Sequence, residues 1–316
     1  MIIDGKKLTF KLVTRALMWR IGNVFFKKLF SLWQSLGFHI IRNHYYQPIP
    51  DTRTLRPELW ERDSDLVGID VNEEKQLELL SDFAGQYKTE YDSLALSKEQ
   101  TTRPYEFYID NRAFRAVDAE ILYCMIRKYR PQKIFEAGSG YSTYLLAKAV
   151  LQNKKINNVE CELVVFDPYP NDVIKAGFPG LSKTISARIQ DVPLSKFSEL
   201  KENDILFIDS SHVLTIGSDV QYLYLDAIPR LNKGVVVHIH DILLPMEYPK
   251  GWVLKEHYFW NEQYVLQAFL SFNSAFEVIW AGRFMHLKHP DKLVDAFASC
   301  ERVGSQPGSF WIRRVV

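Results

Sequence analysis

Cysteine is scarce in this sequence, and its few cysteines are not spaced for a metal or a disulfide framework. The 316 residues include three, Cys124, Cys161 and Cys300, with no Cys-x-x-Cys pair. This excludes a zinc site of the common spacing and a disulfide-stapled domain. We interpret the three side chains as small buried hydrophobic groups of a protein in a reducing, cytoplasmic compartment.

The sequence also has almost no net charge. Its 39 basic and 38 acidic residues leave a formal charge of +1, which argues against a dedicated nucleic-acid-binding protein. The balance conceals an asymmetry. Residues 1–47 hold eight basic residues against Asp4 alone, which leaves 31 basic and 37 acidic residues elsewhere. A basic, aromatic-rich head therefore precedes a mildly acidic body, and we expect no nucleic-acid partner.

The head lacks an apolar run long enough for a membrane-spanning helix or a secretory signal. Arg20, Lys27 and Lys28 interrupt it, whereas a spanning helix needs about 20 mostly apolar residues. Two interpretations stay open. Residues 1–43 lie as a basic amphipathic helix on the inner membrane surface, or they dock on the body with a solvated basic face. Apolar residues recur there at helical spacing: Leu17, Ile21, Val24, Phe25, Leu29, Leu32 and Leu36.

Internal repeats are absent too, and the pattern along the chain divides it into three regions. Residues 1–57 form a basic helical arm and a proline-rich connector, residues 58–112 a helical cap, and residues 113–316 the main domain. The main domain alternates short apolar runs with helical segments, which predicts an α/β fold with a doubly wound parallel sheet.

Seven apolar runs are predicted to be the strands of this sheet. They are Lys133–Ala137, Glu162–Asp167, Ile185–Ile189, Asp204–Asp209, Gly234–His240, Phe276–Ala281 and Ser309–Arg314. Helices are predicted over 113–130, 141–152, 171–176, 194–200, 218–231 and 258–273. No helix is predicted between the last two strands, which we expect to form an antiparallel hairpin at the sheet edge. Ligands of such sheets bind at the carboxyl ends of the strands.

The first predicted strand runs into a glycine loop, Glu136-Ala137-Gly138-Ser139-Gly140, and then into a helix. Glycines let the backbone approach a ligand closely, and the helix N-terminus presents free N–H groups. A dinucleotide fingerprint would require a third glycine where Thr143 stands. Glu136 would repel a phosphate, so the loop favours a ligand that carries an amine or another cation.

Acidic residues follow the next two predicted strands. Asp167 ends the second strand, where one carboxylate can accept both hydroxyls of a ribose. Asp191 follows the third strand, where a polar group meets an adenine in ligands of this kind. A helix cap at Asp167 and a solvated turn at Asp191 are the structural alternatives.

Polar groups also gather after the fourth and fifth predicted strands. Asp209 and His212 follow the fourth strand, and His240 and Asp241 follow the fifth. Because these strands are expected to be neighbours, the four side chains are predicted to converge. Two interpretations stay open: a divalent cation bound by Asp209, His240 and Asp241, or a metal-free general base made of histidine and aspartate.

These motifs together resemble those of the class I S-adenosylmethionine-dependent methyltransferases. The resemblance rests on EAGSGYST, VVFDP, DILFIDSSH and GVVVHIHDI, and covers about residues 105–316. FIDSSH and HIHD are most similar to the branch that holds small-molecule and sugar O-methyltransferases. The resemblance implies a Rossmann-like seven-stranded doubly wound sheet, with six parallel strands and a final antiparallel one, and S-adenosylmethionine as the cofactor.

The resemblance also implies residue roles. The methionine end of the cofactor would lie at the glycine loop, the ribose at Asp167, and the adenine between Asp191 and Val192. Metal-dependent relatives such as catechol O-methyltransferase carry an acid pair after strand five, and His240 breaks that pattern here. The cofactor-binding residues implied in this way are Glu136, Gly138, Ser139, Gly140, Tyr141, Ser142, Thr143, Asp167, Pro168, Asp191, Val192, Asp209 and Ser210.

The sequence thus predicts methyl transfer to a hydroxyl of a small molecule or sugar. The base would be His212 or His240, oriented by Asp209 or Asp241, with magnesium or another divalent cation as an open alternative. Residues 245–265 carry aromatic side chains, including Trp260, that would wall the acceptor pocket. A nicotinamide-dependent oxidoreductase and a non-catalytic membrane-associated protein are the rival interpretations, and homo-oligomer formation is left open.

Overall fold

The computed structural model describes residues 28–41, 43–304 and 306–316, and these fall into two compact units. One unit combines the described residues up to Leu59 with Gly251–Phe259, and the other comprises Trp60–Lys250 and Trp260–Val316. In the smaller unit, helix α2 spans Phe30–Ser35, 3₁₀ turns lie at Thr52–Thr54 and Pro57–Trp60, and a π-helical turn covers Trp252–Glu256. The predicted arm helix before residue 28 lies outside the described residues.

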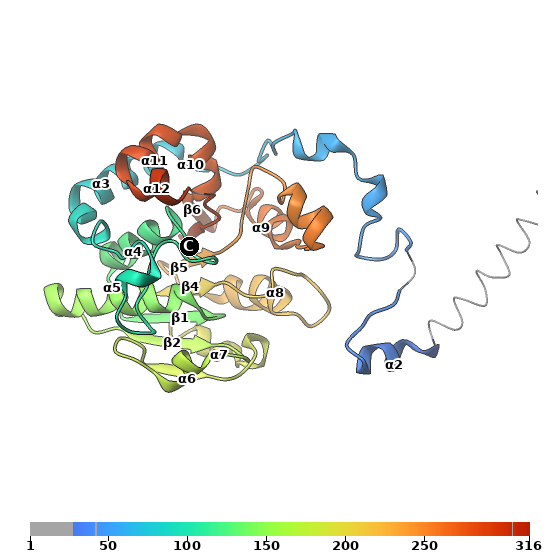
Figure 1. Cartoon of the computed structure of the whole chain (residues 1–316), viewed down its shortest axis with the longest axis horizontal. Helices are drawn as coiled ribbons and strands as arrows, with labels where there is room; N and C mark the ends of the chain where they lie inside the picture. Colours follow the sequence, from blue (N-terminus) through green and yellow to red (C-terminus); the bar gives the residue numbers. More distant parts are fainter. Residues whose placement is uncertain (1–27, 42, 305) are drawn as a thin grey trace, which may run out of the picture. The chain divides into compact units, whose positions relative to one another are not determined.

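The larger unit is built on a seven-stranded sheet in the order β3-β2-β1-β4-β5-β7-β6 (Figure 1). All strands run parallel except β7, which pairs antiparallel with both β5 and β6. Strand order therefore reverses between β1 and β4, the position at which such sheets bind ligands. The strands are β1 (Lys133–Ala137), β2 (Glu162–Phe166), β3 (Lys183–Ile185), β4 (Ile205–Ile208), β5 (Val236–Ile239), β6 (Phe276–Ala281) and β7 (Phe310–Arg314). This confirms the predicted Rossmann-like fold.

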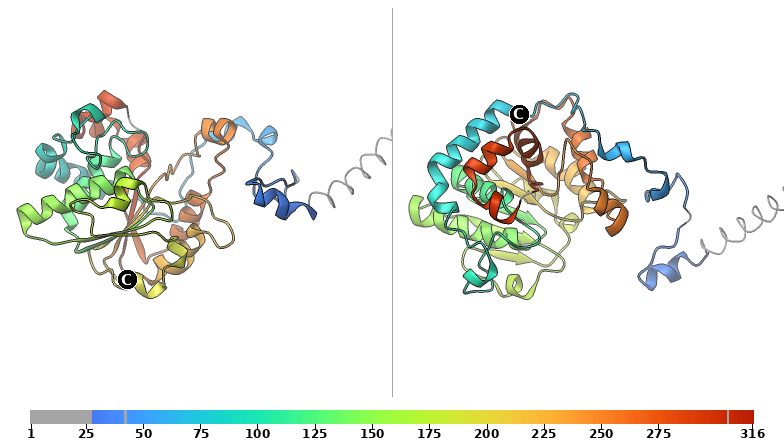
Figure 2. Two further views of the ribbon diagram at one scale, coloured as in Figure 1. Left: turned by 60° about the horizontal axis from the view of Figure 1, so that its bottom comes forward. Right: turned by 45° about the horizontal axis from the view of Figure 1, so that its top comes forward.

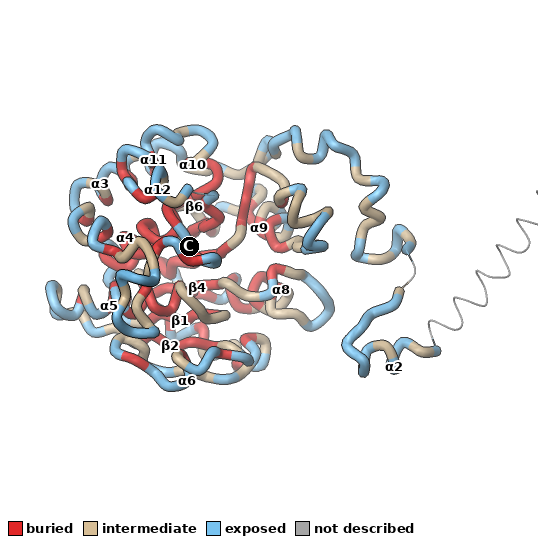
Figure 3. Tube along the Cα trace, viewed as in Figure 1, coloured by how far each residue is buried: buried red, intermediate tan, exposed pale blue. Residues whose placement is uncertain are grey.

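Helices cover both faces of the sheet, with α5 on one face and α8 on the other (Figure 2). The central strands are buried along their whole length, as Figure 3 shows, because both faces are covered. The α-helices of this unit are α3 (Glu73–Tyr91), α4 (Asp118–Tyr129), α5 (Tyr141–Asn157), α6 (Asp172–Ala176), α7 (Leu194–Phe197), α8 (Asp219–Tyr222), α9 (Glu262–Leu270), α10 (Gly282–Lys288), α11 (Pro290–Ala296) and α12 (Ser299–Val303).

A buried ion pair joins α3 to the helices on the sheet. Arg127 of α4 donates from Nε to Glu90 of α3 at 2.8 Å, and from Nη1 to Asn157 of α5 at 2.8 Å. Tyr123 donates to the same Glu90 carboxylate at 2.8 Å. The helical cap predicted from the sequence is thus tied to the sheet layer through α4. The predicted division into residues 1–57, 58–112 and 113–316 stays a prediction.

Two predictions about the sheet are wrong in detail. Strand β3 ends at Ile185, where the prediction began, because its ladder to β2 runs from Val164↔Lys183 to Phe166↔Ile185 and stops where β2 stops. As an edge strand it is half-exposed and polar, so the apolar run lies beyond it. Three helices, α10 to α12, lie between β6 and β7, where none was predicted. They have five to seven residues each, too few to show a helical period.

The predicted helix over 218–231 is also divided. Its first turn is α8, which continues as a π-helical turn at Leu223–Ala227 and a 3₁₀ turn at Ile228–Arg230. Pro229 lacks the N–H that an α-helical turn requires at this point. Among the described residues, no helix combines the length and the apolar character that crossing a bilayer requires.

Candidate active site

The glycine loop links β1 to α5 and contacts the end of β4. Gly138 has φ +86°, and a Cβ built there would lie 1.8 Å from the backbone oxygen of Asp209. Only glycine fits at this position, because the neighbouring backbone occupies the space of a side chain. A Cβ at Gly140 would meet no heavy atom within 4 Å. The second glycine therefore leaves space open, whereas the first allows two strand ends to approach.

Glu136, the last acid of β1, is fully buried behind this loop. Its Oε1 accepts a hydrogen bond from the Ser142 hydroxyl at 2.7 Å, while its Oε2 is buried with no partner among the described residues. Burial raises the pKa of Glu136 to about 8, against the lowering effect of the Ser142 and Thr143 hydroxyls. The carboxyl is therefore mostly protonated at pH 7.

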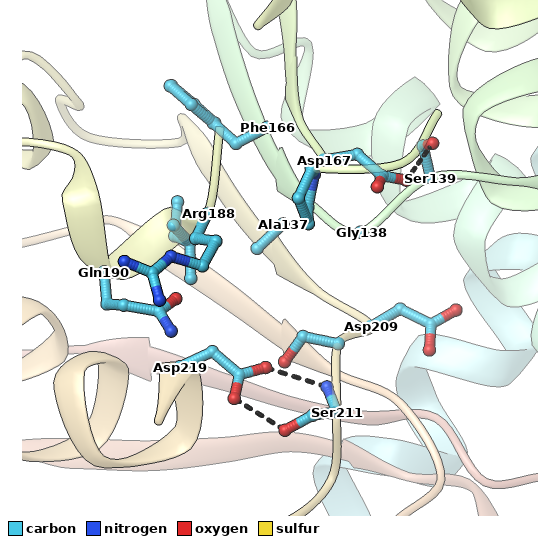
Figure 4. A pocket seen from close by; sticks show the side chains of 13 residues that line it. Ala137, Gly138, Ser139, Phe166, Asp167, Arg188, Gln190, Asp209, Ser211 and Asp219 are labelled. Atoms are coloured by element: carbon cyan, nitrogen blue, oxygen red, sulfur yellow. Dashed lines mark hydrogen bonds between the residues drawn. The ribbon is translucent and has the colours of Figure 1, made fainter. Parts of the chain in front are cut away.

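A cavity of about 400 Å³ opens beside the glycine loop, at the carboxyl ends of β1, β2 and β4 (Figure 4). Asp167 lies on its wall. This carboxylate accepts hydrogen bonds from the Ser139 hydroxyl and from the Tyr169 backbone N–H, the latter at 2.7 Å. The lining comprises Ala137, Gly138, Ser139, Phe166, Asp167, Pro168, Arg188, Ile189, Gln190, Asp209, Ser210, Ser211 and Asp219.

The segment after β3 turns a different set of residues to the cavity than the sequence suggested. Arg188, Ile189 and Gln190 line it, while Asp191 forms a bidentate ion pair with the partly exposed Arg188, at 2.8 and 2.9 Å. Val192 is buried, and its carbonyl accepts a hydrogen bond from Tyr222.

The first turn of α5 supports the loop from behind. The Tyr141 hydroxyl lies 2.9 Å from that of Tyr108, and Thr143 Oγ1 accepts the Gly140 N–H at 3.0 Å. Ser142 bonds to Glu136, as described above. These three predicted residues hold the loop, and the cavity wall is made by its neighbours.

His212 stands at the centre of a second cluster, at the ends of β4 and β5. Its Nε2 lies 3.4 Å from Asp209 and 3.6 Å from Asp241, and its Nδ1 lies 2.9 Å from Glu262. The Trp260 ring lies 4.5 Å from the imidazole, centroid to centroid. The first residue of α9 thus supplies the third carboxylate, because the His212 carbonyl accepts the backbone N–H groups of Asn261 and Glu262.

The charges of this cluster control its pKa values. Burial lowers the pKa of His212, but hydrogen bonds to Asp209 and Glu262 outweigh it and raise the value well above 6.5. Burial raises the pKa of Asp209, yet the charges of His240 and His212 lower it to about 2. Asp209 is therefore ionised, and His212 is an imidazolium in the resting state. Both His212 and Asp241 have positive φ, at 60° and 55°, a strained conformation that is common at functional sites.

His240 belongs to the same region but contacts it less directly. Its Nε2 lies 3.8 Å from Asp241, its Nδ1 is buried without a partner among the described residues, and its ring packs on Phe114 at 4.8 Å. His238, two residues earlier, points into the core, stacks on Phe207 and lies 3.0 Å from the Ser309 hydroxyl. The predicted convergence of Asp209, His212, His240 and Asp241 is thus present in the structure.

The cluster as it stands does not fit a divalent cation. His212 occupies the space between Asp209 and Asp241, and Glu262 holds its other ring nitrogen. Within the described ranges, no three His, Cys, Asp or Glu side chains are grouped as a metal site.

Comparison with known proteins identifies a methyltransferase domain within the chain. Residues 135–242 match the family described as "Methyltransferase domain". An uncharacterized protein of Archaeoglobus fulgidus is 35% identical over 182 residues, which cover 55% of this chain and 80% of that protein. Residues 135–242 are therefore a methyltransferase domain, which agrees with the resemblance of the sequence motifs to S-adenosylmethionine-dependent methyltransferases. This favours methyl transfer over the nicotinamide-dependent alternative.

Solved structures similar to the methyltransferase include CmcI with magnesium and S-adenosylmethionine, at 18% identity and a TM-score of 0.35, over 69% of this chain and 83% of that one. The TDP-rhamnose 3′-O-methyltransferase CalS11 matches at 11% identity and a TM-score of 0.39, over 82% of this chain and 99% of that one.

S-adenosylmethionine fits the cavity of the methyltransferase. The open space at Gly140 admits backbone approach, and Asp167 offers a carboxylate at the end of β2. The fully buried Oε2 of Glu136 has no hydrogen-bond partner among the described residues. The sequence did not indicate Arg188, Gln190, Asp219 or Glu262. Asp219 and Glu262 begin helices, where an acid also serves the helix dipole, so no local pattern separates the two roles.

Proposed function

We propose that this methyltransferase methylates a hydroxyl group of a small molecule or sugar. The observation that carries the proposal is the buried imidazole of His212, held among Asp209, Asp241 and Glu262 beside the Trp260 ring. An oxygen acceptor must lose its proton during methylation, and an imidazole oriented by carboxylates is a general base suited to this task. The indole of Trp260 offers an apolar face for a ring-shaped acceptor.

In the proposed reaction, the proton of the acceptor hydroxyl passes to Nε2 of His212. Glu262 fixes the ring through Nδ1, and Asp209 and Asp241 stabilise the imidazolium that results. The cofactor, when bound, supplies an activated methyl group on a positively charged sulfur. Because the carboxylates raise the pKa of His212, the resting imidazolium must first release a proton to solvent. The rate is therefore expected to increase with pH above 6.5.

The cofactor is proposed to bind along the cavity of Figure 4. Gly138, Ser139 and Gly140 would hold its amino-acid end, with Glu136 as the nearby acid, and Asp167 would accept from the ribose hydroxyls. Arg188, Ile189 and Gln190 would border the adenine of the cofactor, since they line the cavity at the end of β3.

Deprotonation assisted by magnesium at Asp209, His240 and Asp241 is the alternative route. It requires His212 to move out from between the two aspartates. We favour the metal-free route, and expect the same turnover after treatment with EDTA as after addition of Mg²⁺.

The test uses S-adenosylmethionine with a labelled methyl group and a panel of sugar and small-molecule hydroxyls. We expect S-adenosylhomocysteine to bind to the wild type and to His212→Asn alike, with turnover reduced about 10²–10⁴-fold in the variant, the usual contribution of a general base. His289→Asn, at a surface ion pair with Glu73, is the matched control. Full turnover by His212→Asn would reject His212 as the base, and loss of activity with EDTA would favour the metal route. Cofactor binding with no transfer to any hydroxyl would reject the proposed acceptor class.

A further inference from the structure

Arg283 lies at the same edge of the sheet as the His212 cluster. Strands β5 and β6 each pair antiparallel with β7, so they run parallel to each other. The carboxyl end of β6, Ala281, therefore lies on the edge where β4 and β5 end. Gly282 and Arg283 follow directly, as the first residues of α10. A charged side chain thus follows each of three strands on this half of the sheet: Asp209 after β4, Asp241 after β5 and Arg283 after β6.

The Arg283 side chain is buried, and one of its guanidinium nitrogens has no hydrogen-bond partner in the described part of the chain. The residue is 7% exposed, and its Nε is fully buried with no partner among the described residues. An unpaired buried cation is costly, so native proteins pair it with an anion or with a ligand. Burial lowers the pKa of Arg283 from its ordinary value, because removal from water destabilises the charged form of the guanidinium.

Asp118, the acid whose charge acts on Arg283, already accepts two backbone hydrogen bonds. Its two carboxylate oxygens accept the backbone N–H groups of Gly308 and Ser309, both at 2.9 Å. It acts on Arg283 through space and not through a hydrogen bond, and it acts in the same way on His240. The charge of Asp118 thus acts on both groups, and the Nε of Arg283 remains without a hydrogen-bond acceptor in the ranges that the structure describes.

The packing at this point fixes the backbone of Arg283. A Cβ at Gly282 would lie 3.1 Å from both Pro307 Cβ and the Ser309 carbonyl oxygen, so the turn from β6 into α10 is pressed against the start of β7. The neighbouring Gly308 would bring a Cβ to 3.2 Å from Asp241 Cα. Residues 307–309 therefore pack against both the backbone next to Arg283 and the backbone of Asp241 in the cluster.

We propose that Arg283 is the anion-binding residue of the acceptor site, and that the acceptor carries a carboxylate or a phosphate group. The proposal rests on the proposed function, since it names the substrate class of the same site. A guanidinium matches both anions through two parallel N–H donors. Such a group would accept from the unpartnered Nε of Arg283 and would set the acceptor hydroxyl at a fixed distance from His212.

The test is made on the full chain, first with S-adenosylhomocysteine and then with two anion probes, inorganic phosphate and acetate, at constant ionic strength in chloride. We expect saturable binding of at least one probe by calorimetry. Arg283→Gln should weaken it tenfold or more, and Arg283→Lys about threefold to tenfold, since lysine keeps the charge without the paired donors. Arg302→Gln, on an exposed face of α12, should bind as the wild type does. The stronger probe shows whether phosphate or carboxylate is the preferred group.

The outcomes separate the two proposals. Absence of S-adenosylhomocysteine binding in the wild type would reject the proposed function. Intact binding of that ligand without saturable anion binding would reject the role of Arg283 alone. Arg283→Lys also covers the case in which Arg283→Gln fails to fold. If the lysine variant binds S-adenosylhomocysteine and both anions as tightly as the wild type, the proposal is overturned.

Discussion

At the scale of single residues, the two glycines of one loop have different duties. The absent side chain of Gly138 makes room for the backbone of Asp209, whereas that of Gly140 leaves space on the solvent side of the loop. The first glycine is therefore needed for the fold, whereas the second fits the proposed approach of a ligand.

We predict that Gly138→Ala destabilises the protein by about 3 kcal/mol or more, because a Cβ would overlap backbone and the φ is positive. Gly140→Ala should change stability by less than about 1 kcal/mol, yet weaken S-adenosylhomocysteine binding at least tenfold. Urea unfolding and calorimetry measure the two effects. Equal loss of stability in both variants would contradict this division of roles.

The buried carboxyl of Glu136 leads to a second prediction, on how the stability of the protein depends on pH. Its folded pKa of about 8 lies above the unfolded value of 4.5, so the folded state holds the proton more tightly. The stabilisation is complete below about pH 4.5 and is lost as pH rises through about 8. Ser142 and Thr143 hydroxyls face the carboxyl, and the charges of Asp209 and Asp167 act on it.

Unfolding free energies of the wild type and Glu136→Gln at pH 5.5, 7 and 9 test this. We expect the wild type to lose up to several kcal/mol relative to the variant over this range, at about 1.4 kcal/mol per pKa unit. The exposed Glu78→Gln is the control and should follow the wild type. Parallel pH curves for wild type and Glu136→Gln would show that the carboxyl is ionised in the folded state.

Residues that directly follow an apolar run were the ones the sequence could predict. Asp167 and Asp209 are of this kind, because a buried strand that ends in a polar group marks the sheet edge, and His212 follows three residues after Asp209. Glu262 was not predictable, since it reaches His212 from a helix start whose docking depends on distant contacts. Arg283, proposed above for the acceptor site, also lies at a helix start. Asp191 was expected at the cavity, but a local ion pair with Arg188 turns it away.

At the scale of elements, the parallel sheet with one antiparallel strand could be predicted from the sequence, whereas the place of β7 between β5 and β6 and the boundaries at the edges could not. The central strands are buried on both faces and so read as continuous apolar runs. The bounds of the edge strand β3 are set by its hydrogen bonds to β2 and not by a run of apolar residues. The short helices α10 to α12 are held by packing, so no periodic signal announces them.

The contact between α4 and β7 gives an element-scale prediction. Asp118, the first residue of α4, accepts two backbone N–H groups at the start of β7. Asp118→Ala leaves both donors buried without this acceptor and should cost about 2–4 kcal/mol in urea unfolding. Asp110→Ala, whose carboxylate is half-exposed, should cost less than about 1 kcal/mol. An equally small effect at Asp118 would mean that water replaces the carboxylate.

At the scale of the whole molecule, the charge asymmetry of the sequence leads to a prediction on location. If residues 1–43 bind an anionic bilayer, the full chain should sediment with vesicles containing anionic lipid and not with neutral ones. Replacing Lys27 and Lys28 by glutamate should weaken this binding about 30-fold or more, at about 1 kcal/mol per lost positive charge. Replacing the exposed Lys154 and Lys155 instead provides the control. Binding to neither vesicle would favour the docked arm.

The place of β7 in the sheet has a consequence for assembly. It comes after the other six strands in the chain, yet it pairs between β5 and β6. Until β7 arrives, β5 presents a bare hydrogen-bonding edge and β6 has no neighbour in the sheet, and open edges of this kind favour association with other chains. Chaperone demand and aggregation during synthesis should therefore depend on how soon residues 310–314 are available, long after every residue of the cofactor cavity has been made.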